Sequence, residues 1–372
     1  MKQEKMDRIP VHADGAWLYD IVLADSFAGL QGELERLSVS QRKLCIVTDS
    51  QVAPLYLAQV EKILAGCCRK ACHFIFPAGE ENKNLDTVRE LYEYLIVNKY
   101  DRKDCLVALG GGVVGDLTGF AAATYLRGID FIQLPTTLLS QVDSGIGGKT
   151  GVDFDAYKNM VGAFHMPKLV YTNVSALKTL PGEQFSAGMG EVLKHGLIRD
   201  KEYFAWLVEN RDQILAGEQK ALWLLIQGSD LIKREVVELD PTEQNERATL
   251  NFGHTLGHAI EKLKNFSMLH GHCVAVGALA AMEISRRRGM ISKADVEDYR
   301  KALADYGIRS TVSGLSADEV LAATKNDKKM EAGVIKFVLL NGVGNACIDR
   351  TVTTEEMREG LFVVMNEDGK GV

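Results

Sequence analysis

The sequence lacks the features that would place a protein in a membrane or on nucleic acid. Its longest apolar runs, such as CVAVGALAAM, are too short to span a bilayer, and residues 1–15 contain no apolar core of signal-peptide length. Positive charge is not in excess, because the formal net charge is −7. This excludes a general nucleic-acid binder and leaves room only for a local cationic pocket. We therefore expect a soluble, cytoplasmic protein with neither nucleic acid nor a membrane as partner.

The cysteines form no pattern with a recognised chemistry. There are seven of them, an odd number, and only the stretch GCCRKAC is clustered. Its spacing matches neither Cys-x-x-Cys nor a zinc ribbon, so we assign the cysteines no role. Internal repeats and low-complexity tracts are also lacking. With 46% hydrophobic and 25% charged residues over 372 positions, the chain has an ordinary globular composition and is long enough for two domains.

The first half of the chain alternates strand and helix patterns. Runs rich in β-branched and apolar residues predict strands at 43–50, 72–79, 105–112 and 129–137. Helical periodicity at 52–66 and 84–99, and a glycine- and alanine-rich segment ending near 128, predict the helices between these strands. Such alternation predicts an α/β domain, a variant Rossmann-like fold with a mostly parallel sheet.

Helical patterns dominate the second half. They predict helices at 183–199, 201–216, 220–238, 253–264, 272–289 and 293–305, with one strand-like segment at 335–348. We therefore predict two domains: an α/β, nucleotide-binding domain at 1–175 and a mainly α-helical domain at 176–372, which would carry the metal and substrate sites.

A glycine-rich turn joins a predicted strand to a predicted helix. The stretch DCLVALGGGVVGDLTGF contains Gly110-x-Gly112-x-x-Gly115, and glycines in this context let the backbone approach a pyrophosphate at a helix N-terminus. Tight strand–helix packing would also require glycines. The acidic residue expected about 20 positions further on is absent, because Asp130 opens the next strand, whereas Asp49 closes the strand at 43–50 and is the better ribose contact. We predict a nicotinamide nucleotide as ligand.

The segment LPTTLLSQVDSGIGGKTGVDFDAYKN, residues 134–159, is unusually rich in glycine, hydroxyl and lysine side chains. Its GGKT resembles the end of a P-loop, but Asp143 stands where that motif requires glycine. Lysines among glycines and hydroxyls suit an oxyanion such as phosphate, and the alternative is a solvated interdomain loop. We favour the anion site.

Half of the histidines lie close together in the second half of the chain: His254, His258, His270 and His272. The first two have the spacing of a metalloprotease helix, yet no Glu follows His254 as His-Glu-x-x-His requires. Spacing alone favours His254 and His258 as paired metal ligands. Hydrogen-bonded core histidines are the alternative.

Upstream, SAGMGEVLKHGLI places Glu191, Lys194 and His195 within one helical turn among apolar neighbours. Buried charges are normally paired or bind a metal. One carboxylate with two imidazoles and an open position is typical of a catalytic zinc site. For His195 we prefer an ordinary core role.

Several long segments of the chain resemble the 3-dehydroquinate synthase family. The resemblance extends over about residues 43 to 350 and rests on GGGVVGDLTGFAAATYLRG, IQLPTTLLSQVDSGIGGKTGV, KNMVGAFHMPKLV, GMGEVLKHGLI, RATLNFGHTLGHAIE and LHGHCVAVG. It implies conversion of 3-deoxy-D-arabino-heptulosonate 7-phosphate to 3-dehydroquinate and phosphate, the second step of the shikimate pathway. The implied reaction uses transient oxidation by NAD, phosphate elimination, re-reduction and intramolecular aldol closure. A divalent metal, zinc or cobalt, and a homodimer are implied as well.

The resemblance also implies roles for individual residues. It implies Glu191, His254 and His270 as metal ligands and moves His258 to the substrate, against the spacing argument. Arg127 would reach the phosphate bound by a neighbouring subunit. The positions matching substrate contacts are Asp143, Lys149, Asn159, Lys194, Lys233, Arg247, Asn251, His258, Lys328 and Arg127. The positions matching NAD contacts are Asp49, Glu80, Lys83, Gly111, Gly112, Val113, Asp116, Thr136, Thr137, Lys149, Lys158 and Thr179.

The chain departs from the family pattern in two places. His272 stands where the family has Glu, which adds an imidazole near the metal ligands, and DPTEQNER replaces a more acidic run before Arg247. Neither change removes a matched ligand. The alternatives are another sugar phosphate cyclase, a metal-dependent polyol or alcohol dehydrogenase, and a nucleotide-binding regulatory protein. The segment QVDSGIGGKT favours 3-dehydroquinate formation.

Overall fold

The structure is a computed structural model that describes residues 6–155, 157–324, 330–331 and 334–366. The chain divides into two compact units. The sheet unit comprises Met1–Leu180 and Leu222–Pro241, and the helical unit comprises Pro181–Ala221 and Thr242–Val372. The predicted boundary after residue 175 lies close to the first of these divisions. The sequence carried no sign that Leu222–Pro241 groups with the first unit.

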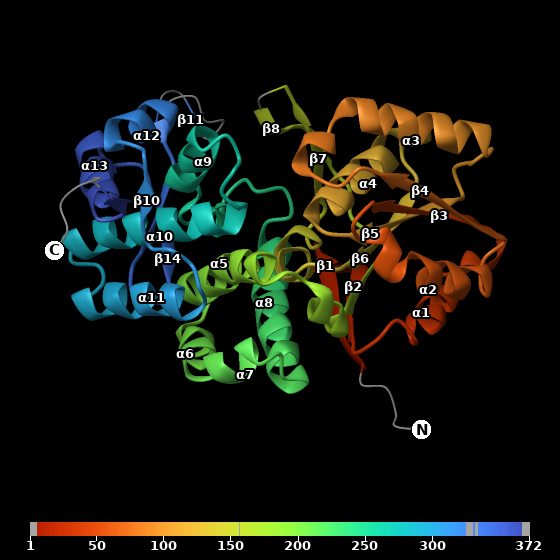
Figure 1. Ribbon diagram of the computed structural model, residues 1–372, viewed down its shortest axis with the longest axis horizontal. Coiled ribbons are helices and arrows are strands. Elements are labelled where there is room, and N and C mark those ends of the chain that lie inside the picture. The colour runs from red at the N-terminus through yellow and green to blue at the C-terminus, as the bar shows by residue number, and fades with distance from the viewer. Residues whose placement is uncertain (1–5, 156, 325–329, 332–333, 367–372) are drawn as a thin grey trace. The chain divides into compact units, whose positions relative to one another are not determined.

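The sheet unit is built on a seven-stranded sheet in the order β1-β2-β9-β6-β5-β3-β4 (Figure 1). Every neighbouring pair is parallel except β1 and β2, which confirms the mostly parallel sheet. The strands are β1 Met6–Ala13, β2 Ala16–Ala24, β3 Lys43–Asp49, β4 Lys70–Phe76, β5 Cys105–Gly110, β6 Asp130–Pro135 and β9 Leu169–Asn173. The strands predicted at 43–50, 72–79, 105–112 and 129–137 correspond to β3, β4, β5 and β6.

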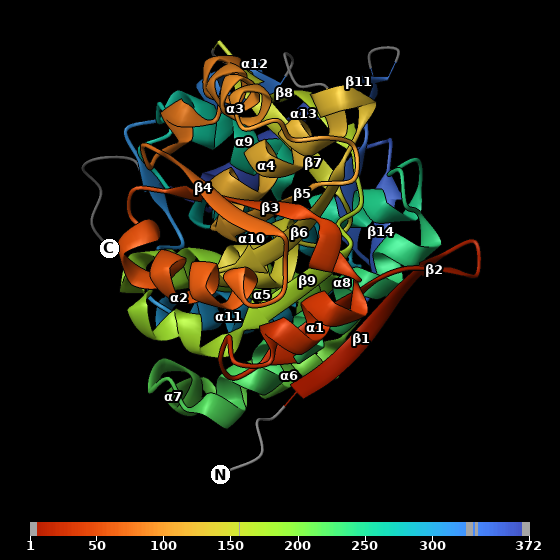
Figure 2. The ribbon, with the colours of Figure 1, turned by 90° about the vertical axis from the view of Figure 1, so that its right-hand side faces the viewer.

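Helices cover both faces of this sheet. Alternate residues of β3 enter two separate cores, because successive side chains of a strand point to opposite faces. Cys45 and Val47 pack with residues of α3 Leu85–Val97 and α4 Gly112–Thr124, whereas Leu44 and Ile46 pack with residues of α1 Leu30–Arg36 and α2 Ala53–Ala65. Figure 2 shows the two helix pairs on opposite sides of β3 and β4. The central strand β5 is buried along its whole length, as expected for a parallel strand covered on both faces.

The polar segment at 134–159 leads into an antiparallel hairpin that the sequence did not predict. The hairpin consists of β7 Lys149–Phe154 and β8 Tyr157–Phe164, and the single turn η4 Ser140–Ser144 precedes it. All of α8 Gln219–Leu239 except its first three residues also belongs to the sheet unit. It is tied to the N-terminal strands, since Trp223 Nε1 donates to Asp7 Oδ2 at 2.7 Å and the backbone N–H of His12 donates to Glu238 Oε1 at 2.7 Å.

The helical unit is organised around α10 His270–Arg287, which packs against α5, α9, α11 and α13. Most of α10 is buried, because helices surround it on several sides. The other helices are α5 Gly182–Arg199, α6 Lys201–Glu209, α7 Arg211–Leu215, α9 His254–Leu263, α11 Lys293–Asp305, α12 Ala317–Thr324 and α13 Thr354–Phe362. The short strands are β10 Val312–Ser313, β11 Met330–Glu331, β12 Val334–Ile335, β13 Phe337–Leu340, β14 Ala346–Asp349 and β15 Met365–Asn366. The predicted helices of the second half are confirmed, with 201–216 divided into α6 and α7.

Glycines allow α5 and α9 to approach α10 at backbone distance. A Cβ atom added to Gly271 would lie 1.9 Å from the carbonyl oxygen of Ala187, and one added to Gly190 would lie 2.3 Å from that of Gly271. On α9's side, a Cβ atom at Gly277 would lie 2.1 Å from the carbonyl oxygen of Gly253. Larger residues at these crossings would separate the helices. The crossings therefore set the positions of the side chains that α5, α9 and α10 carry.

Within the described ranges, no helix combines the length and the apolar character that crossing a membrane requires.

Candidate active site

Three predicted metal ligands converge in the helical unit. Glu191 lies on α5, His254 is the first residue of α9 and His270 is the first residue of α10. Glu191 Oε1 lies 3.7 Å from His254 Nε2 and 3.6 Å from His270 Nε2. Glu191 is fully buried and His254 nearly so. The fold thus gathers one carboxylate and two imidazoles from segments far apart in the sequence.

The second nitrogen of each imidazole faces an oxygen that can only accept a hydrogen bond. His254 Nδ1 lies 3.2 Å from the carbonyl oxygen of Phe252, and His270 Nδ1 lies 3.2 Å from Glu261 Oε2. Both Nδ1 atoms therefore donate, and both Nε2 atoms point towards Glu191. Two Nε2 atoms and a carboxylate oxygen are a donor set that suits a divalent metal with positions left open.

His270 is the member of this set whose protonation is most strongly perturbed. Burial by itself disfavours the charged imidazole, but hydrogen bonds with Glu191 and Glu261 raise the pKa of His270 to about 9. Without a metal, the ring holds a second proton near neutral pH, on the side that faces Glu191. A divalent ion would replace that proton, since metal binding requires the neutral imidazole.

His258 completes a triangle of imidazoles. Its ring centroid lies 5.1 Å from that of His254 and 5.6 Å from that of His270, and ring nitrogens of the three residues come within 4.8 Å of one another. The structure therefore brings together both sets of ligands considered from the sequence, the pair favoured by spacing and the set implied by resemblance.

The other predicted residues of the helical unit lie on α5, in the short helix η6 Glu246–Asn251 or outside the described residues. Lys194 is buried one turn along α5, and its Nζ forms an ion pair with Glu191 Oε2. His195 is buried on the same helix. Arg247 is fully buried in the short helix η6 Glu246–Asn251, and Asn251 Nδ2 donates to Glu243 Oε1 at 2.7 Å. Lys328 lies outside the described residues.

A second charged cluster lies in the sheet unit, around Lys83. Lys83 Nζ lies 2.7 Å from Glu80 Oε1, 3.6 Å from Asp116 Oδ2 and 3.7 Å from Asp153 Oδ1, and Lys158 Nζ lies 3.4 Å from the same Glu80 oxygen. Asp153 is the member that the sequence reasoning missed. It lies on β7, within the polar segment at 134–159, but nothing in that segment distinguished it as a partner of Lys83.

The charges of this cluster shift one another. Burial disfavours the ammonium of Lys83, but the carboxylates of Asp116, Glu80 and Asp153 raise its pKa. For Asp116 burial is the dominant effect and raises its pKa to about 7. Partial burial opposes ionisation of Glu80 as well, yet Lys83 and Lys158 lower its pKa. The cluster thus retains Lys83 and Glu80 as charged groups and disfavours the charged form of Asp116.

The glycine turn has the predicted strand–turn–helix context. β5 ends at Gly110 and α4 begins at Gly112. A Cβ atom at Gly111 would lie 3.0 Å from Thr137 Cγ2, and the backbone N–H of Thr136 donates to the carbonyl oxygen of Gly110 at 2.9 Å. Val113 lies in the first turn of α4. The turn is therefore packed closely against the first residues after β6.

Asp49 and Thr179, two further predicted nucleotide contacts, hold local structure in the sheet unit. Asp49 Oδ1 accepts hydrogen bonds from the backbone N–H groups of Gln51 and Val52, both at 2.8 Å, which turns the chain from β3 into α2. The hydroxyl of Thr179 hydrogen-bonds with that of Tyr56 on α2. Asp49 is the last residue of β3, at the carboxyl edge where open parallel sheets bind ligands, whereas Thr179 ends the short helix η5 Val174–Thr179 that follows β9.

The remaining predicted substrate contacts of the sheet unit are spread over η4, the hairpin and α8. Asp143 Oδ1 and Lys233 Nζ form an ion pair. Lys149 is exposed at the start of β7, and Asn159 on β8 has a left-handed φ of 50°. Arg127 is exposed, with a φ of 69°. Left-handed backbone at a non-glycine residue carries strain that is frequent at functional positions.

Tyr19 supports the glycine-rich part of this segment, although the N-terminal forty residues gave no functional signal. Its side chain is fully buried, and its hydroxyl accepts a hydrogen bond of 3.0 Å from the backbone N–H of Gly147. Gly147 and Gly148 have positive φ angles of 91° and 65°. Tyr19 therefore anchors a turn that only glycines adopt readily.

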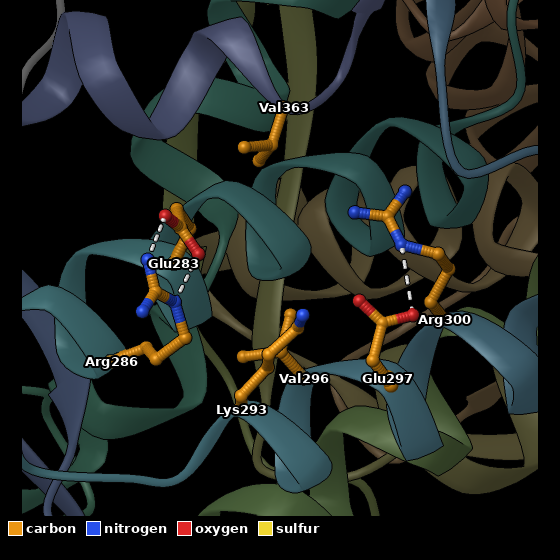
Figure 3. A pocket seen from close by; sticks show the side chains of 7 residues that line it. All are labelled: Glu283, Arg286, Lys293, Val296, Glu297, Arg300 and Val363. Atoms are coloured by element: carbon orange, nitrogen blue, oxygen red, sulfur yellow. Dashed lines mark hydrogen bonds and ion pairs between the residues drawn. The ribbon is translucent and has the colours of Figure 1, made fainter. Parts of the chain in front are cut away.

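The helical unit also contains a cavity of about 250 Å³ that none of the predicted site residues lines (Figure 3). Glu283 accepts two hydrogen bonds from Arg286, both at 2.7 Å, and Glu297 Oε2 lies 3.9 Å from Arg300 Nε. Because neighbouring carboxylates already pair with these guanidinium groups, we assign the cavity no role. Its lining consists of Glu283, Arg286, Lys293, Val296, Glu297, Arg300 and Val363.

Two family models match consecutive parts of the chain. The model of the 3-dehydroquinate synthase N-terminal region matches residues 73–187, and that of the C-terminal region matches residues 188–330. The chain belongs to the 3-dehydroquinate synthase family. A 3-dehydroquinate synthase from Acetivibrio thermocellus is 43% identical over 325 residues, which are 87% of this chain and 90% of that protein. One from Nitrosospira multiformis is 42% identical over 332 residues, 89% and 91% of the two chains.

Solved structures of related cyclases share the whole fold. A 2-epi-5-epi-valiolone synthase from Streptomyces hygroscopicus subsp. jinggangensis, with NAD+ and Zn2+ bound, has a TM-score of 0.86 at 26% identity over 95% of this chain and 98% of that one. A 2-deoxy-scyllo-inosose synthase complexed with carbaglucose-6-phosphate, NAD+ and Co2+ has a TM-score of 0.84 at 25% identity over 96% and 100%. An NADH-dependent butanol dehydrogenase from Thermotoga maritima, at 14% identity and a TM-score of 0.69, shares the fold alone.

His272, which departs from the 3-dehydroquinate synthase pattern, contacts α5 in the structure. His272 Nε2 lies 2.9 Å from the hydroxyl oxygen of Ser186 on α5, and burial lowers the pKa of this imidazole. The side chain thus ties the start of α10 to α5.

Proposed function

We propose that this member of the 3-dehydroquinate synthase family converts 3-deoxy-D-arabino-heptulosonate 7-phosphate to 3-dehydroquinate and phosphate, with NAD and a divalent zinc or cobalt ion. The convergence of Glu191, His254 and His270 on one carboxylate oxygen carries the proposal. Identities of 42% and 43% over most of the chain to 3-dehydroquinate synthases support the substrate. The cofactors are those present in the related cyclase structures.

In this proposal Glu191, His254 and His270 hold the metal. The support for this set is that Glu191 Oε1 lies 3.7 Å from His254 Nε2 and 3.6 Å from His270 Nε2. When bound, the ion acts as a Lewis acid that lowers the pKa of a coordinated substrate hydroxyl. Lys194 holds Glu191 through its other oxygen, so that Oε1 stays directed at the imidazoles. His258, beside both of them, relays a proton at the substrate hydroxyl that is oxidised.

The substrate phosphate and hydroxyls need cationic and hydrogen-bonding partners. We assign the phosphate to Lys149, Asn159, Lys194 and Arg247, because guanidinium and ammonium groups form strong hydrogen bonds with phosphate oxygens. The phosphate group of the substrate would act as the base in the elimination, taking the proton from the neighbouring carbon as its own C–O bond breaks. Asp143, held by Lys233, orients a substrate hydroxyl. Asn251, which donates to Glu243, and Lys328 complete the substrate set.

NAD supplies a reversible oxidation, so it ends each turnover unchanged. We place its pyrophosphate at the turn formed by Gly111 and Gly112, where the N-terminus of α4 favours negative charge. The other residues assigned to it are Asp49, Glu80, Lys83, Val113, Asp116, Thr136, Thr137, Lys149, Lys158 and Thr179.

A homodimer is part of the proposal, because Arg127 would act on the phosphate bound by a neighbouring subunit. Its side chain is exposed, as this role requires. The homodimer and the cytoplasmic location stay predictions.

The decisive experiment is an assay of inorganic phosphate released from the heptulosonate 7-phosphate, with zinc and catalytic NAD, while absorbance reports NADH. Phosphate release without NADH accumulation is the expected result. Steady NADH production from a simple alcohol, with no phosphate released, would move the protein to the dehydrogenases that share its fold.

A further inference from the structure

We propose that Glu261 is a positioning residue that holds His270 in the orientation needed for metal binding. The inference rests on the proposed function, in which His270 is a ligand, and it adds a residue outside that ligand set. Glu261 lies in the last part of α9, and its side chain is 4% exposed. Its Oε2 lies 3.2 Å from His270 Nδ1.

This contact determines which nitrogen of His270 faces the metal site. A carboxylate accepts, so Nδ1 keeps its hydrogen and Nε2 is left 3.6 Å from Glu191 Oε1. His270 needs such a tie, because it is the first residue of α10 and its side chain is 30% exposed. Carboxylates that bind the outer nitrogen of a ligating imidazole fix its tautomer and raise its basicity as a ligand.

His254 is oriented in a different way. Its Nδ1 faces the carbonyl oxygen of Phe252, a backbone group two residues earlier. That contact forms whenever the chain folds and no side-chain substitution removes it. The orientation of His270 depends instead on one side chain from another helix, which makes it the imidazole whose positioning can be removed by mutation.

The packing of α9 on α10 explains why Glu261 reaches His270. A Cβ atom at Gly253 would lie 2.6 Å from the carbonyl oxygen of Val274, and one at Gly257 would lie 2.8 Å from that of Cys273. Gly253, Gly257 and Glu261 are four residues apart, so they lie along one face of the helical segment. The two glycines contact the first half of α10, and Glu261, one turn further along the same face of α9, lies at the start of α10 next to His270.

The test compares Glu261→Ala and Glu261→Gln with Glu283→Gln. Glu283 is a matched control, since it is a buried carboxylate on α10 that pairs with Arg286 and Arg287. Each purified full-length protein is stripped of metal and titrated with Zn2+ against a chromophoric chelator. The visible absorption spectrum of the Co2+ form reports ligand geometry. Circular dichroism and urea unfolding of the metal-free proteins report folding.

We expect Glu261→Ala to weaken Zn2+ binding by about 10- to 100-fold and to change the Co2+ spectrum. Glu261→Gln should weaken binding less, because its carboxamide oxygen still accepts from Nδ1. Glu283→Gln should retain wild-type Zn2+ affinity, whatever its effect on stability. Wild-type affinity and an unchanged Co2+ spectrum in Glu261→Ala would overturn the proposal. If that variant does not fold, the same result in Glu261→Met, which keeps the side-chain length but offers no oxygen acceptor to Nδ1, would overturn it.

A failure of the proposed function would look different. In that case the wild-type protein would bind no Zn2+, or Glu191→Gln would bind it as tightly as the wild type.

Discussion

The charged clusters around Lys83 in the sheet unit and around Glu191 in the helical unit have opposite centres. In the sheet unit a lysine, Lys83, is surrounded by the carboxylates of Glu80, Asp116 and Asp153. In the helical unit a carboxylate, Glu191, is surrounded by an ammonium group and two imidazoles. In the first cluster the cation is a side chain, Lys83. The second cluster consists largely of groups that can bind a metal cation.

In both clusters a bound proton offsets part of the negative charge, but the consequences for metal binding differ. In the sheet unit the surplus carboxylate, Asp116, has its pKa raised to about 7, so a proton removes negative charge that Lys83 does not compensate. In the helical unit the proton is on His270, whose pKa is raised to about 9. A proton on a carboxylate oxygen beside an ammonium group is not exchanged for a metal. A proton on an imidazole Nε2 that faces a carboxylate can be replaced by a metal ion.

The largest effect should follow removal of the charge at the centre of the helical cluster. Glu191→Gln keeps the volume but leaves the buried ammonium of Lys194 without its carboxylate. We expect loss of bound zinc and at least about a 100-fold loss of turnover. Metal content of the purified protein and phosphate release measure the two effects. A variant that retains one zinc ion per chain and full turnover would remove Glu191 from the ligand set.

The corresponding change in the sheet unit removes its central cation. Lys83→Met leaves the nearby carboxylates without their nearest ammonium group, and breaking a buried pair costs about 3–5 kcal/mol. Urea unfolding at about pH 8 measures the change. The control is Lys168→Met, because Lys168 pairs with Asp130 at 3.6 Å and is 47% exposed, so its loss should cost at most about 1 kcal/mol. Equal losses of unfolding free energy in both variants would show that burial does not make the Lys83 ion pairs more stabilising than the Lys168 ion pair.

Local patterns predicted the scaffold around both clusters better than the clusters themselves. The turn after β5 was predictable because strand, glycines and helix follow one another in the sequence. Spacing favoured His254 and His258, and it gave no sign that Glu191 and His270 lie close to His254. Glu191, His254 and His270 meet only through the glycine crossings between three helices, and no sequence pattern shows which glycines touch. The resemblance to the 3-dehydroquinate synthase family implied this set, and it stays a prediction.

Long-range contacts account for what was missed. Tyr19 supports Gly147 across 128 residues, and neither strand of the N-terminal hairpin was predicted. Asp153 joins the Lys83 cluster from an unpredicted strand. These contacts depend on tertiary packing, which the alternation of apolar and polar residues does not encode.

The helix crossings give a smaller effect that tests how the helical cluster is positioned. In Gly271→Ala the added Cβ atom meets the backbone of Ala187 at 1.9 Å, so α5 and α10 must move apart. We expect the metal-free protein to lose about 1–3 kcal/mol and to bind zinc more weakly. Gly182→Ala on α5 is the control, since its Cβ atom meets nothing within 4 Å. Similar thermal unfolding and zinc affinity in the two variants would show that the crossing does not set the ligand geometry.

The smallest effect concerns the proton on Asp116 and depends on pH. Burial raises the folded-state pKa to about 7, whereas an unfolded Asp titrates near pH 3.9, so between these values the folded state binds the extra proton. Stability from this group is therefore fully present below about pH 3.9 and is lost as the pH rises through about 7. Asp116→Asn cannot ionise and should gain about 1–3 kcal/mol on the wild type between about pH 5 and pH 8.5 in urea unfolding. The control is Asp86→Asn, which replaces a carboxylate that is 86% exposed. The difference in free energy of unfolding between this variant and the wild type should stay constant over this pH range. A constant difference for Asp116→Asn as well would mean that Asp116 is already ionised at about pH 5, with Lys83 compensating its charge in full.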